Sequence, residues 1–205
     1  MSMIKNIIFD FGDVFINLDK KATFENLKEL GVKKFSSEML EVTKQYEMGM
    51  LTTQEFLNTF KILFPFISEL EFKNAWNSML LDFPMYRLSF IKSLAKSKKF
   101  RIFLLSNTND MHISWIKKNW GSKLFSEFKN CFEKFYLSHE LQLRKPNKDI
   151  YEFIMESNKL LPYETLFIDD TLENTIVPKS LGIKIWNLDP NSEDVVDLFS
   201  KKEFN

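Results

Sequence analysis

The sequence predicts a doubly wound α/β fold, in which a parallel sheet of five or more strands carries an all-helical cap inserted after the first strand. Three observations support this prediction. Short apolar runs alternate with amphipathic segments of helix length, which is typical of parallel strands joined by right-handed helical crossovers. Most of these runs are continuously apolar, as expected for strands buried on both faces. One stretch of roughly sixty residues breaks the alternation and keeps a helical pattern throughout.

Five apolar runs are the predicted strands. The first lies in "KNIIFDFGDVF" (5–15) and stops at Asp10. A carboxylate directly after buried strand residues is unfavourable unless it is solvated, hydrogen-bonded or bound to a cation, so partners for Asp10 are expected elsewhere in the chain. The other four runs are "RIFLLS" (101–106), "CFEKFYLS" (131–138), "TLFIDD" (165–170) and "IKIWNL", centred on 184–188.

The amphipathic segments between the strands are the predicted core helices. They lie at roughly 86–98, 109–120, 147–160 and 173–181, and each has the apolar spacing of a helix with one buried face. The C-terminal "SEDVVDLFSKKEFN" (192–205) is a predicted last helix with a frayed end.

The helical stretch after the first strand is predicted to form a separate cap. Its sequence "TTQEF" offers a capping box between Thr52 and Glu55, which is typical of a helix N-terminus. We therefore expect a core domain made of 1–16 and 84–205, and a helical cap made of 17–83.

Charge and composition limit the possible partners. Lys plus Arg number 28 and so do Asp plus Glu, so the chain lacks the basic field that drives binding to nucleic acids or anionic membranes. A single cysteine, Cys131, cannot form an internal disulfide, and no segment approaches the ~18 apolar residues of a membrane span. We expect a cytoplasmic protein without nucleic-acid or membrane partners. The sequence does not indicate its oligomeric state.

Polar side chains follow the ends of the predicted strands. Because ligands of open parallel sheets bind beyond the carboxyl ends of the strands, we expect these side chains to converge. Carboxylates from the first and fourth strands form an oxygen-only cluster that suits Mg²⁺, while an ammonium and a hydroxyl suit an anionic phosphate. The side chains are Asp10, Ser106, Asn107, Lys145, Asp169, Asp170 and Asn174.

Four of these segments resemble a known family. In order and with typical spacing, "FDFGDV", "LLSNTN", "RKPNKDIY" and "FIDDTLEN" are similar to the four motifs of the haloacid dehalogenase-like (HAD) hydrolase superfamily. Within it, "YLSHELQLRKP" and the glycine two places after the first aspartate are similar to the group that contains the α-D-glucose-1-phosphate phosphatase. The resemblance implies a Rossmann-like core with a small helical cap, and a Mg²⁺-dependent phosphatase acting on a small phosphorylated metabolite such as a sugar phosphate.

The resemblance also implies a role for each acid. Asp10 is expected to be the nucleophile, which attacks phosphorus in line and forms an aspartyl-phosphate that water then hydrolyses. The same side chain is expected to ligate Mg²⁺ together with the backbone carbonyl of Gly12 and with Asp170. Asp169 and Asn174 are expected to support the metal site.

The remaining motif residues are expected to bind the phosphoryl group. The resemblance implies that Ser106 and Asn107 hold its oxygens, and that Lys145 orients Asp10 and balances charge. These roles agree with the physical chemistry, because phosphoryl transfer depends mainly on positioning and on charge stabilisation.

Gly12 departs from the pattern of most phosphatases in this superfamily, which have an aspartate there as general acid and base. Positioned acids are commonly worth ~10² to 10⁴ in rate, so we expect a substrate with a good leaving group, such as a sugar 1-phosphate. Asp13 is an alternative acid, although its interpretation as a turn residue that caps loop amides is favoured.

Other polar and aromatic residues have weaker patterns. His112 and His139 lack ligand spacing and are interpreted as surface or helix-terminus residues, although His139 precedes the Lys145 loop and is kept as a candidate near the pocket. The residues considered for selecting the organic part of the substrate are Phe15, Tyr46, Glu47, Met48 and Trp76.

Three other functions stay open at this point. A C-halogen hydrolase of the same superfamily would use Asp10 without a metal, which leaves the paired acids Asp169 and Asp170 without a purpose. A non-catalytic module would bind a phosphorylated metabolite or a protein partner without releasing phosphate. A signalling receiver domain has its acid pair on the first strand, the reverse of the order seen here.

Overall fold

The computed structural model describes residues 3–201 and contains a five-stranded sheet in the order β3-β2-β1-β4-β5. Every neighbouring pair of strands is parallel, so the predicted fold class is confirmed. The strands are β1 (Asn6–Phe9), β2 (Arg101–Ser106), β3 (Lys134–Leu137), β4 (Thr165–Asp169) and β5 (Lys184–Asn187).

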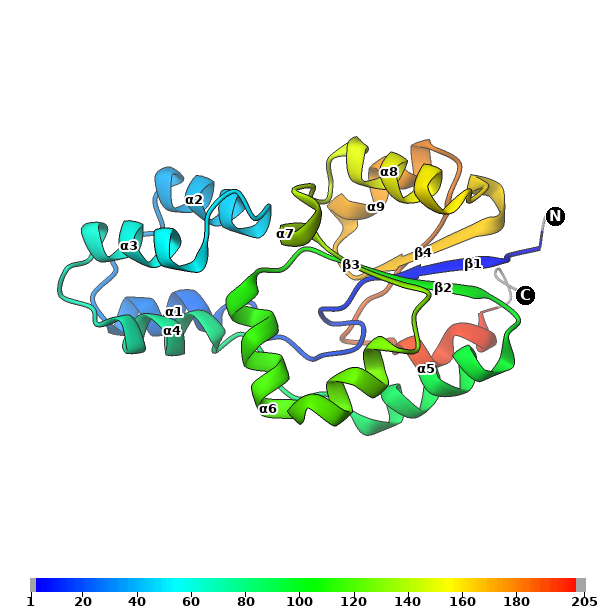
Figure 1. Cartoon of the computed structure of the whole chain (residues 1–205), viewed down its shortest axis with the longest axis horizontal. Coiled ribbons are helices and arrows are strands. Elements are labelled where there is room, and N and C mark those ends of the chain that lie inside the picture. The colour runs from blue at the N-terminus through cyan, green and yellow to red at the C-terminus, as the bar shows by residue number, and fades with distance from the viewer. Residues whose placement is uncertain (1–2, 202–205) are drawn as a thin grey trace.

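Helices cover both faces of the sheet (Figure 1). One face packs against α5 (Met85–Ser97), α6 (Asp110–Lys129) and the short 3₁₀ helix η2 (Val195–Ser200). The opposite face packs against α8 (Lys148–Asn158) and α9 (Leu172–Ser180). A further 3₁₀ turn, η1 (Pro162–Glu164), leads into β4.

Strand β1 shows why the apolar runs are continuous. Ile7 and Phe9 belong to the hydrophobic cluster on one face of the sheet, whereas Ile8 belongs to the cluster on the other face. Successive side chains of a strand point to opposite faces, so a strand covered on both sides needs apolar residues at every position.

Helix α6 is longer than the sequence predicts. It continues past residue 120 to Lys129, with a break at Gly121, where φ is 78°. Phe125 and Phe128 are buried after this break, so packing on the core restores the helix that the glycine interrupts. The strand predicted at 131–138 is observed only as β3 (Lys134–Leu137). Ser138, the last residue of the predicted strand, instead begins the short helix α7 (Ser138–Leu141).

The predicted C-terminal helix is only partly observed. The described residues contain η2 in this region, which is a 3₁₀ helix and not an α-helix. The predicted frayed end at 202–205 lies outside the described residues.

Four helices between β1 and α5 form the cap, which lies beyond the carboxyl ends of the strands (Figure 1). The capping box predicted for its third helix is confirmed: the Glu55 N–H donates to Thr52 Oγ1, and the Thr52 N–H donates to the Glu55 carboxylate at 2.8 Å. The cap helices share a hydrophobic cluster in which aromatic rings pack closely, and Met111 of α6 also belongs to this cluster. The helices are α1 (Ala22–Glu29), α2 (Ser37–Glu47), α3 (Thr53–Leu63) and α4 (Glu69–Asn77).

The backbone is closely packed at two places where the cap meets the core. The entering and leaving segments pair with each other, since the Asn17 N–H donates to the Asp82 carbonyl at 2.9 Å and the Leu81 N–H donates to the Asn17 carbonyl at 3.0 Å. On the other side, the end of α2 lies against α7. Gly49 approaches this helix so closely that a Cβ at this position would lie 2.0 Å from the His139 carbonyl oxygen, and its φ is +65°. A glycine is therefore needed at the junction.

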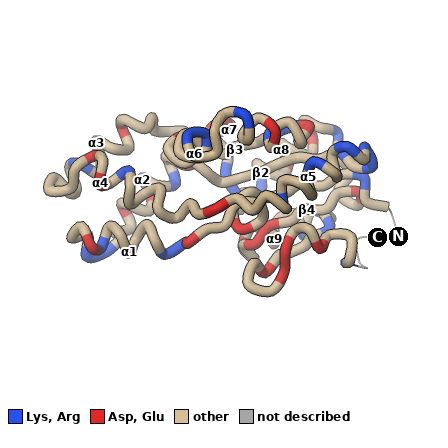
Figure 2. Tube along the Cα trace, turned by 90° about the horizontal axis from the view of Figure 1, so that it is seen from below, with Lys and Arg blue, Asp and Glu red and all other residues tan. Residues whose placement is uncertain are grey.

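Charged residues of both signs are interleaved along the helices of the cap and the core (Figure 2). This distribution agrees with the zero net charge of the sequence. In the part of the chain that the structure describes, no helix combines the length and the apolar character needed to cross a membrane.

Candidate active site

A buried lysine lies between two carboxylates at the carboxyl edge of the sheet. Lys145 Nζ donates to Asp10 Oδ1 and to Asp169 Oδ2, each at 2.6 Å, and to the Leu105 carbonyl at 3.1 Å. Asp10 directly follows β1, Asp169 ends β4, and Lys145 lies in the loop before α8. The strand ends therefore bring together the acids and the ammonium that the sequence predicts at this edge.

Burial makes this cluster electrostatically unusual. Burial, reinforced by the carboxylates of Asp169 and Asp170, raises the pKa of Asp10 to about 7, although Lys145 acts in the opposite direction. Burial alone would lower the pKa of the Lys145 ammonium, but the two carboxylates that it bonds outweigh this effect and raise the pKa above its ordinary value. One ammonium thus neutralises only part of the negative charge, and an additional cation would be favoured.

Three carboxylates have the spacing of a metal site. Asp10, Asp169 and Asp170 each offer one oxygen, and these oxygens all lie within 4.8 Å of one another. Asp169 is already engaged, because its carboxylate accepts hydrogen bonds from the Thr171 N–H at 2.8 Å, from Asn174 Nδ2 and from Lys145. An oxygen-only donor set with excess negative charge fits a hard cation such as Mg²⁺.

Lys20, which the sequence reasoning missed, reaches this acidic cluster from the start of the cap. Its ammonium bonds Asp170 and lies 3.1 Å from Asp13 Oδ2. Burial opposes the charged form of Lys20, yet the bonds to both acids raise its pKa. Nothing in the sequence distinguishes Lys20 from its neighbour Lys21.

Asp13 is engaged by its own loop. Its φ is 53°, and its Oδ1 accepts a hydrogen bond from the Leu18 N–H at 2.9 Å. This geometry matches the turn-capping interpretation, and the described residues that line the nearby cavity do not include Asp13. Gly12 does line the cavity, and a Cβ at Gly12 would lie 2.6 Å from Leu18 Cδ1. Leu18 therefore fills the space that a side chain at position 12 would need.

The second strand contributes Ser106 and Asn107. Ser106 is buried at the end of β2, and both residues line the cavity. The Asn107 side chain bonds the backbone of Lys145 on both sides: its Nδ2 donates to the Lys145 carbonyl at 2.8 Å, and its Oδ1 accepts from the Lys145 N–H at 2.9 Å. Asn107 thereby fixes the loop that carries the lysine.

Cap and core together enclose a cavity of about 500 Å³ over these residues. This size suits a small metabolite. Lys44 and Glu47 line it from α2, and Arg144 lines it from the loop that also carries Lys145. Burial raises the pKa of Glu47, while Arg144 and Lys44 act in the opposite direction.

Comparison with known proteins agrees with this geometry. The family model of haloacid dehalogenase-like hydrolases matches residues 4–182. The chain belongs to the haloacid dehalogenase-like hydrolase family. It is 30% identical over 190 residues to the D-ribitol-5-phosphate phosphatase of Bacteroides thetaiotaomicron, covering 90% of this chain and 91% of that protein.

Solved structures support the same assignment. A HAD family enzyme of Bacteroides thetaiotaomicron in its magnesium complex superposes with a TM-score of 0.86 and 36% identity, covering 98% of this chain and 100% of that chain. The wild-type form of that enzyme, in complex with magnesium and inorganic phosphate, gives a TM-score of 0.81 at 34% identity, covering 96% and 99% of the two chains.

In this HAD-like hydrolase, His112 lies in the first turn of α6, which confirms the helix-terminus interpretation, but it is buried and not on the surface. It is 8% exposed and lines the cavity, with Nδ1 3.2 Å from Asn109 Nδ2 and Nε2 3.3 Å from the Trp76 carbonyl. Burial lowers the pKa of His112 to about 4. The imidazole is therefore neutral near pH 7. The surface alternative was wrong because His112 packs against Trp76, which the cap contributes.

Several residues considered for substrate selection in this HAD-like hydrolase are core residues. Phe15 is fully buried, and Trp76 is 5% exposed within the aromatic cluster of the cap. Tyr46 is 1% exposed, and its hydroxyl accepts a hydrogen bond from the Met111 N–H. His139 lies half-buried on α7, and the described lining residues do not include it. Of the cap candidates, Glu47 lines the cavity.

Proposed function

We propose that this protein is a Mg²⁺-dependent phosphatase that hydrolyses a small phosphorylated metabolite through an aspartyl-phosphate on Asp10. The observation that carries the proposal is the buried Lys145 ammonium bound to Asp10 and Asp169 beside Asp170. The phosphatase activity named for the 30% identical relative supports it, as do the complexes of the similar Bacteroides enzyme with magnesium and inorganic phosphate.

Asp10 is the proposed nucleophile. Its carboxylate lines the cavity, and the bond from Lys145 fixes one of its oxygens. The ammonium reduces the repulsion between this carboxylate and an incoming phosphate, and it holds the carboxylate in one orientation for in-line attack on phosphorus. Attack forms a bond from an Asp10 oxygen to phosphorus and breaks the bond from phosphorus to the ester oxygen, which takes a proton from solvent and leaves as the alcohol. Water then attacks phosphorus and breaks its bond to Asp10, which releases inorganic phosphate and regenerates the carboxylate.

Two of the acids and one backbone carbonyl are proposed to hold Mg²⁺. Asp10, Asp170 and the backbone carbonyl of Gly12 would be its protein ligands, and the bound ion would neutralise charge on the phosphoryl oxygens. Asp169 and Asn174 act as positioning residues in this proposal. Asn174 Nδ2 donates to the Asp169 carboxylate, at 3.1 Å to Oδ1, and Asp169 in turn bonds Lys145.

Ser106 is proposed to donate its hydroxyl to a phosphoryl oxygen from the end of β2. Asn107 is proposed to act mainly through Lys145, because both atoms of its amide are bonded to the backbone of that residue. A hydroxyl and an ammonium from neighbouring elements together suit the oxygens of a phosphate dianion.

The substrate class follows from two independent arguments. Gly12 supplies no carboxylate to protonate the leaving group, which favours a sugar 1-phosphate as a substrate with a good leaving group. The D-ribitol-5-phosphate phosphatase relative favours an ester of a polyol. The two arguments differ in the leaving group, because the 5-oxygen of ribitol leaves as an ordinary alkoxide, but both substrates are hydroxyl-rich phosphate monoesters, and we propose this shared class.

A screen of phosphorylated metabolites with and without Mg²⁺ tests the proposal. Wild-type protein should release phosphate only with the metal, and Asp10→Asn should abolish this release. Asp149→Asn, an exposed acid on α8, is the matched control and should retain activity. Phosphate release that persists in Asp10→Asn would overturn the assigned nucleophile. Metal-independent release of halide would favour the C-halogen hydrolase, and ligand binding without phosphate release would favour the non-catalytic module.

A further inference from the structure

We infer that Glu47 and Arg144 form a subsite that binds adjacent hydroxyl groups in the organic part of the substrate. This inference rests on the proposed phosphatase function and adds a specificity-determining pair to it. The two side chains come from different parts of the fold: Glu47 is the last residue of α2 in the cap, and Arg144 belongs to the core loop before α8. Arg144 Nη2 donates to Glu47 Oε2 at 3.0 Å.

The pair is placed where the organic part of a bound phosphate ester would lie. Both side chains line the cavity that also contains Asp10 and Lys145, and Arg144 directly precedes Lys145 in the chain. The Arg144 side chain is 21% exposed and the Glu47 side chain is 24% exposed, so a ligand can reach both. A phosphoryl group bound at Lys145 would therefore extend its ester group toward this pair.

The chemistry of the pair matches hydroxyl groups. A hydroxyl both donates and accepts a hydrogen bond, so it can donate to the Glu47 carboxylate and accept from the Arg144 guanidinium. A second anionic group on the substrate would be repelled by the Glu47 carboxylate. A cationic group would be repelled by the Arg144 guanidinium and by the ammonium of Lys44, which also lines the cavity. A neutral hydroxyl can bond both members of the pair, whereas a charged substituent is attracted by one member and repelled by the other.

The guanidinium has hydrogen-bonding capacity left over. Arg144 Nε is buried, and within residues 3–201 it has no acceptor. A buried donor without a partner is unfavourable, so a small rotation that brings an N–H to a substrate oxygen would improve the bonding of Arg144.

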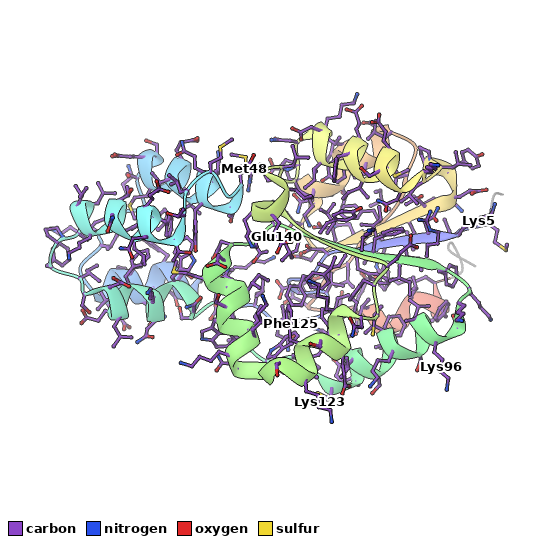
Figure 3. All side chains as sticks on the ribbon, viewed as in Figure 1. Lys5, Met48, Lys96, Lys123, Phe125 and Glu140 are labelled. Atoms are coloured by element: carbon purple, nitrogen blue, oxygen red, sulfur yellow. The ribbon has the colours of Figure 1, made fainter. Side chains whose placement is uncertain are left out.

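The junction between cap and core holds Glu47 in place. The Ser138 hydroxyl donates to the Glu47 carbonyl at 2.6 Å, and Gly49 packs against the carbonyl of His139. Figure 3 labels Met48 at the end of α2 and Glu140 on α7, which mark the two sides of this junction. A side chain anchored in this way can discriminate between substrates, because its position is fixed before binding.

The test compares two phosphate esters in the Mg²⁺-loaded enzyme. One is D-ribitol 5-phosphate, which has adjacent hydroxyls, and the other is p-nitrophenyl phosphate, which has none. Glu47→Gln and Arg144→Met should each lower kcat/KM for ribitol phosphate by roughly 10- to 100-fold, mainly through KM, which is the range for lost hydrogen bonds to charged groups. Both variants should stay within about twofold of wild type on the aryl ester.

A second ion pair provides the matched control. Arg101 bonds Glu133 at 2.5 Å at the amino end of the sheet, away from the cavity. Glu133→Gln should leave both substrates unchanged. Equal losses on both substrates in Glu47→Gln would show a structural role only and would overturn the inference. An unchanged kcat/KM for ribitol phosphate in both site variants would overturn it as well.

A binding measurement separates this inference from the proposed function. Absence of phosphate release by wild-type protein on either ester would refute the phosphatase, and calorimetry then decides the subsite. Ribitol phosphate should bind wild-type protein more tightly than inorganic phosphate does, and Glu47→Gln should remove this difference. Equal affinities of wild type and Glu47→Gln for ribitol phosphate would overturn the hydroxyl subsite.

Discussion

Replacing His112 by glutamine is expected to flatten the decline of stability on the acid side of pH 7. His112 is 8% exposed, and the pKa of its imidazole in the folded protein is about 4, below the ordinary value of 6.5. Because the folded pKa is lowered, the unfolded chain binds the extra proton between these two values. The stabilisation from keeping His112 neutral is therefore complete above pH 6.5 and is lost as the pH falls toward 4.

The size of the effect follows from the two pKa values. A difference of about 2.5 in pKa corresponds to about 3.4 kcal/mol in the free energy of unfolding, at about 1.36 kcal/mol per pKa unit. Carboxylates also titrate in this range, but their contribution is common to wild type and His112→Gln. The difference between the two proteins isolates the imidazole.

Urea unfolding followed by tryptophan fluorescence, in EDTA at pH 7.5 and at pH 5, measures this difference. The stability advantage of wild type over His112→Gln should be larger at pH 7.5 than at pH 5 by about 2 kcal/mol, since one and a half pKa units of the range lie above pH 5. His139→Gln, which changes a half-buried histidine, should show a smaller dependence on pH. An advantage that is constant between the two pH values would show that burial does not lower the pKa of His112.

Three further predictions concern glycines and a lysine. Gly12→Asp should destabilise the fold by about 1 kcal/mol, because the end of the Leu18 side chain must move away from a Cβ at position 12, and a loss in urea unfolding larger than that of Gly49→Ala would contradict the packing. Lys20→Met should tighten Mg²⁺ binding in calorimetry, because it removes a cation that competes for the acidic cluster, whereas weaker binding would show that the lysine assists the metal. Gly49→Ala should cost more than about 1 kcal/mol because of its positive φ and its contact with the carbonyl on α7. Gly121→Ala, where the described residues leave open space around a Cβ, should cost less, and equal losses would contradict the close approach at the junction.

Much of the fold could be predicted from periodicity. Apolar runs identified all five strands, most clearly the central ones that are covered on both faces, and the break in alternation after the first strand predicted the helices that lie between β1 and α5. The extension of α6 beyond Gly121 could not be predicted, because a glycine with positive φ usually ends a helix. Packing of Phe125 and Phe128 on the core overrides that local preference.

The candidate site was predictable where residues follow strands. Asp10 and Asp169 lie at strand ends, so topology alone places them together. The "RKPNKDIY" motif predicts Lys145 at the same site. Lys20 and His112 could not be found in this way. Their surroundings depend on how the cap lies over the core, and this arrangement of elements distant in sequence leaves no periodic signal.

In the proposed mechanism, Asp10 carries the phosphoryl group during turnover. Rapid acid quenching of the Mg²⁺-loaded enzyme with a hydrolysed phosphate ester, followed by peptide mapping by mass spectrometry, tests it directly. We expect a phosphorylated peptide whose modified residue is Asp10, and no such peptide in Asp10→Asn. Phosphate release by wild-type protein with the phosphoryl group found on another residue would contradict it.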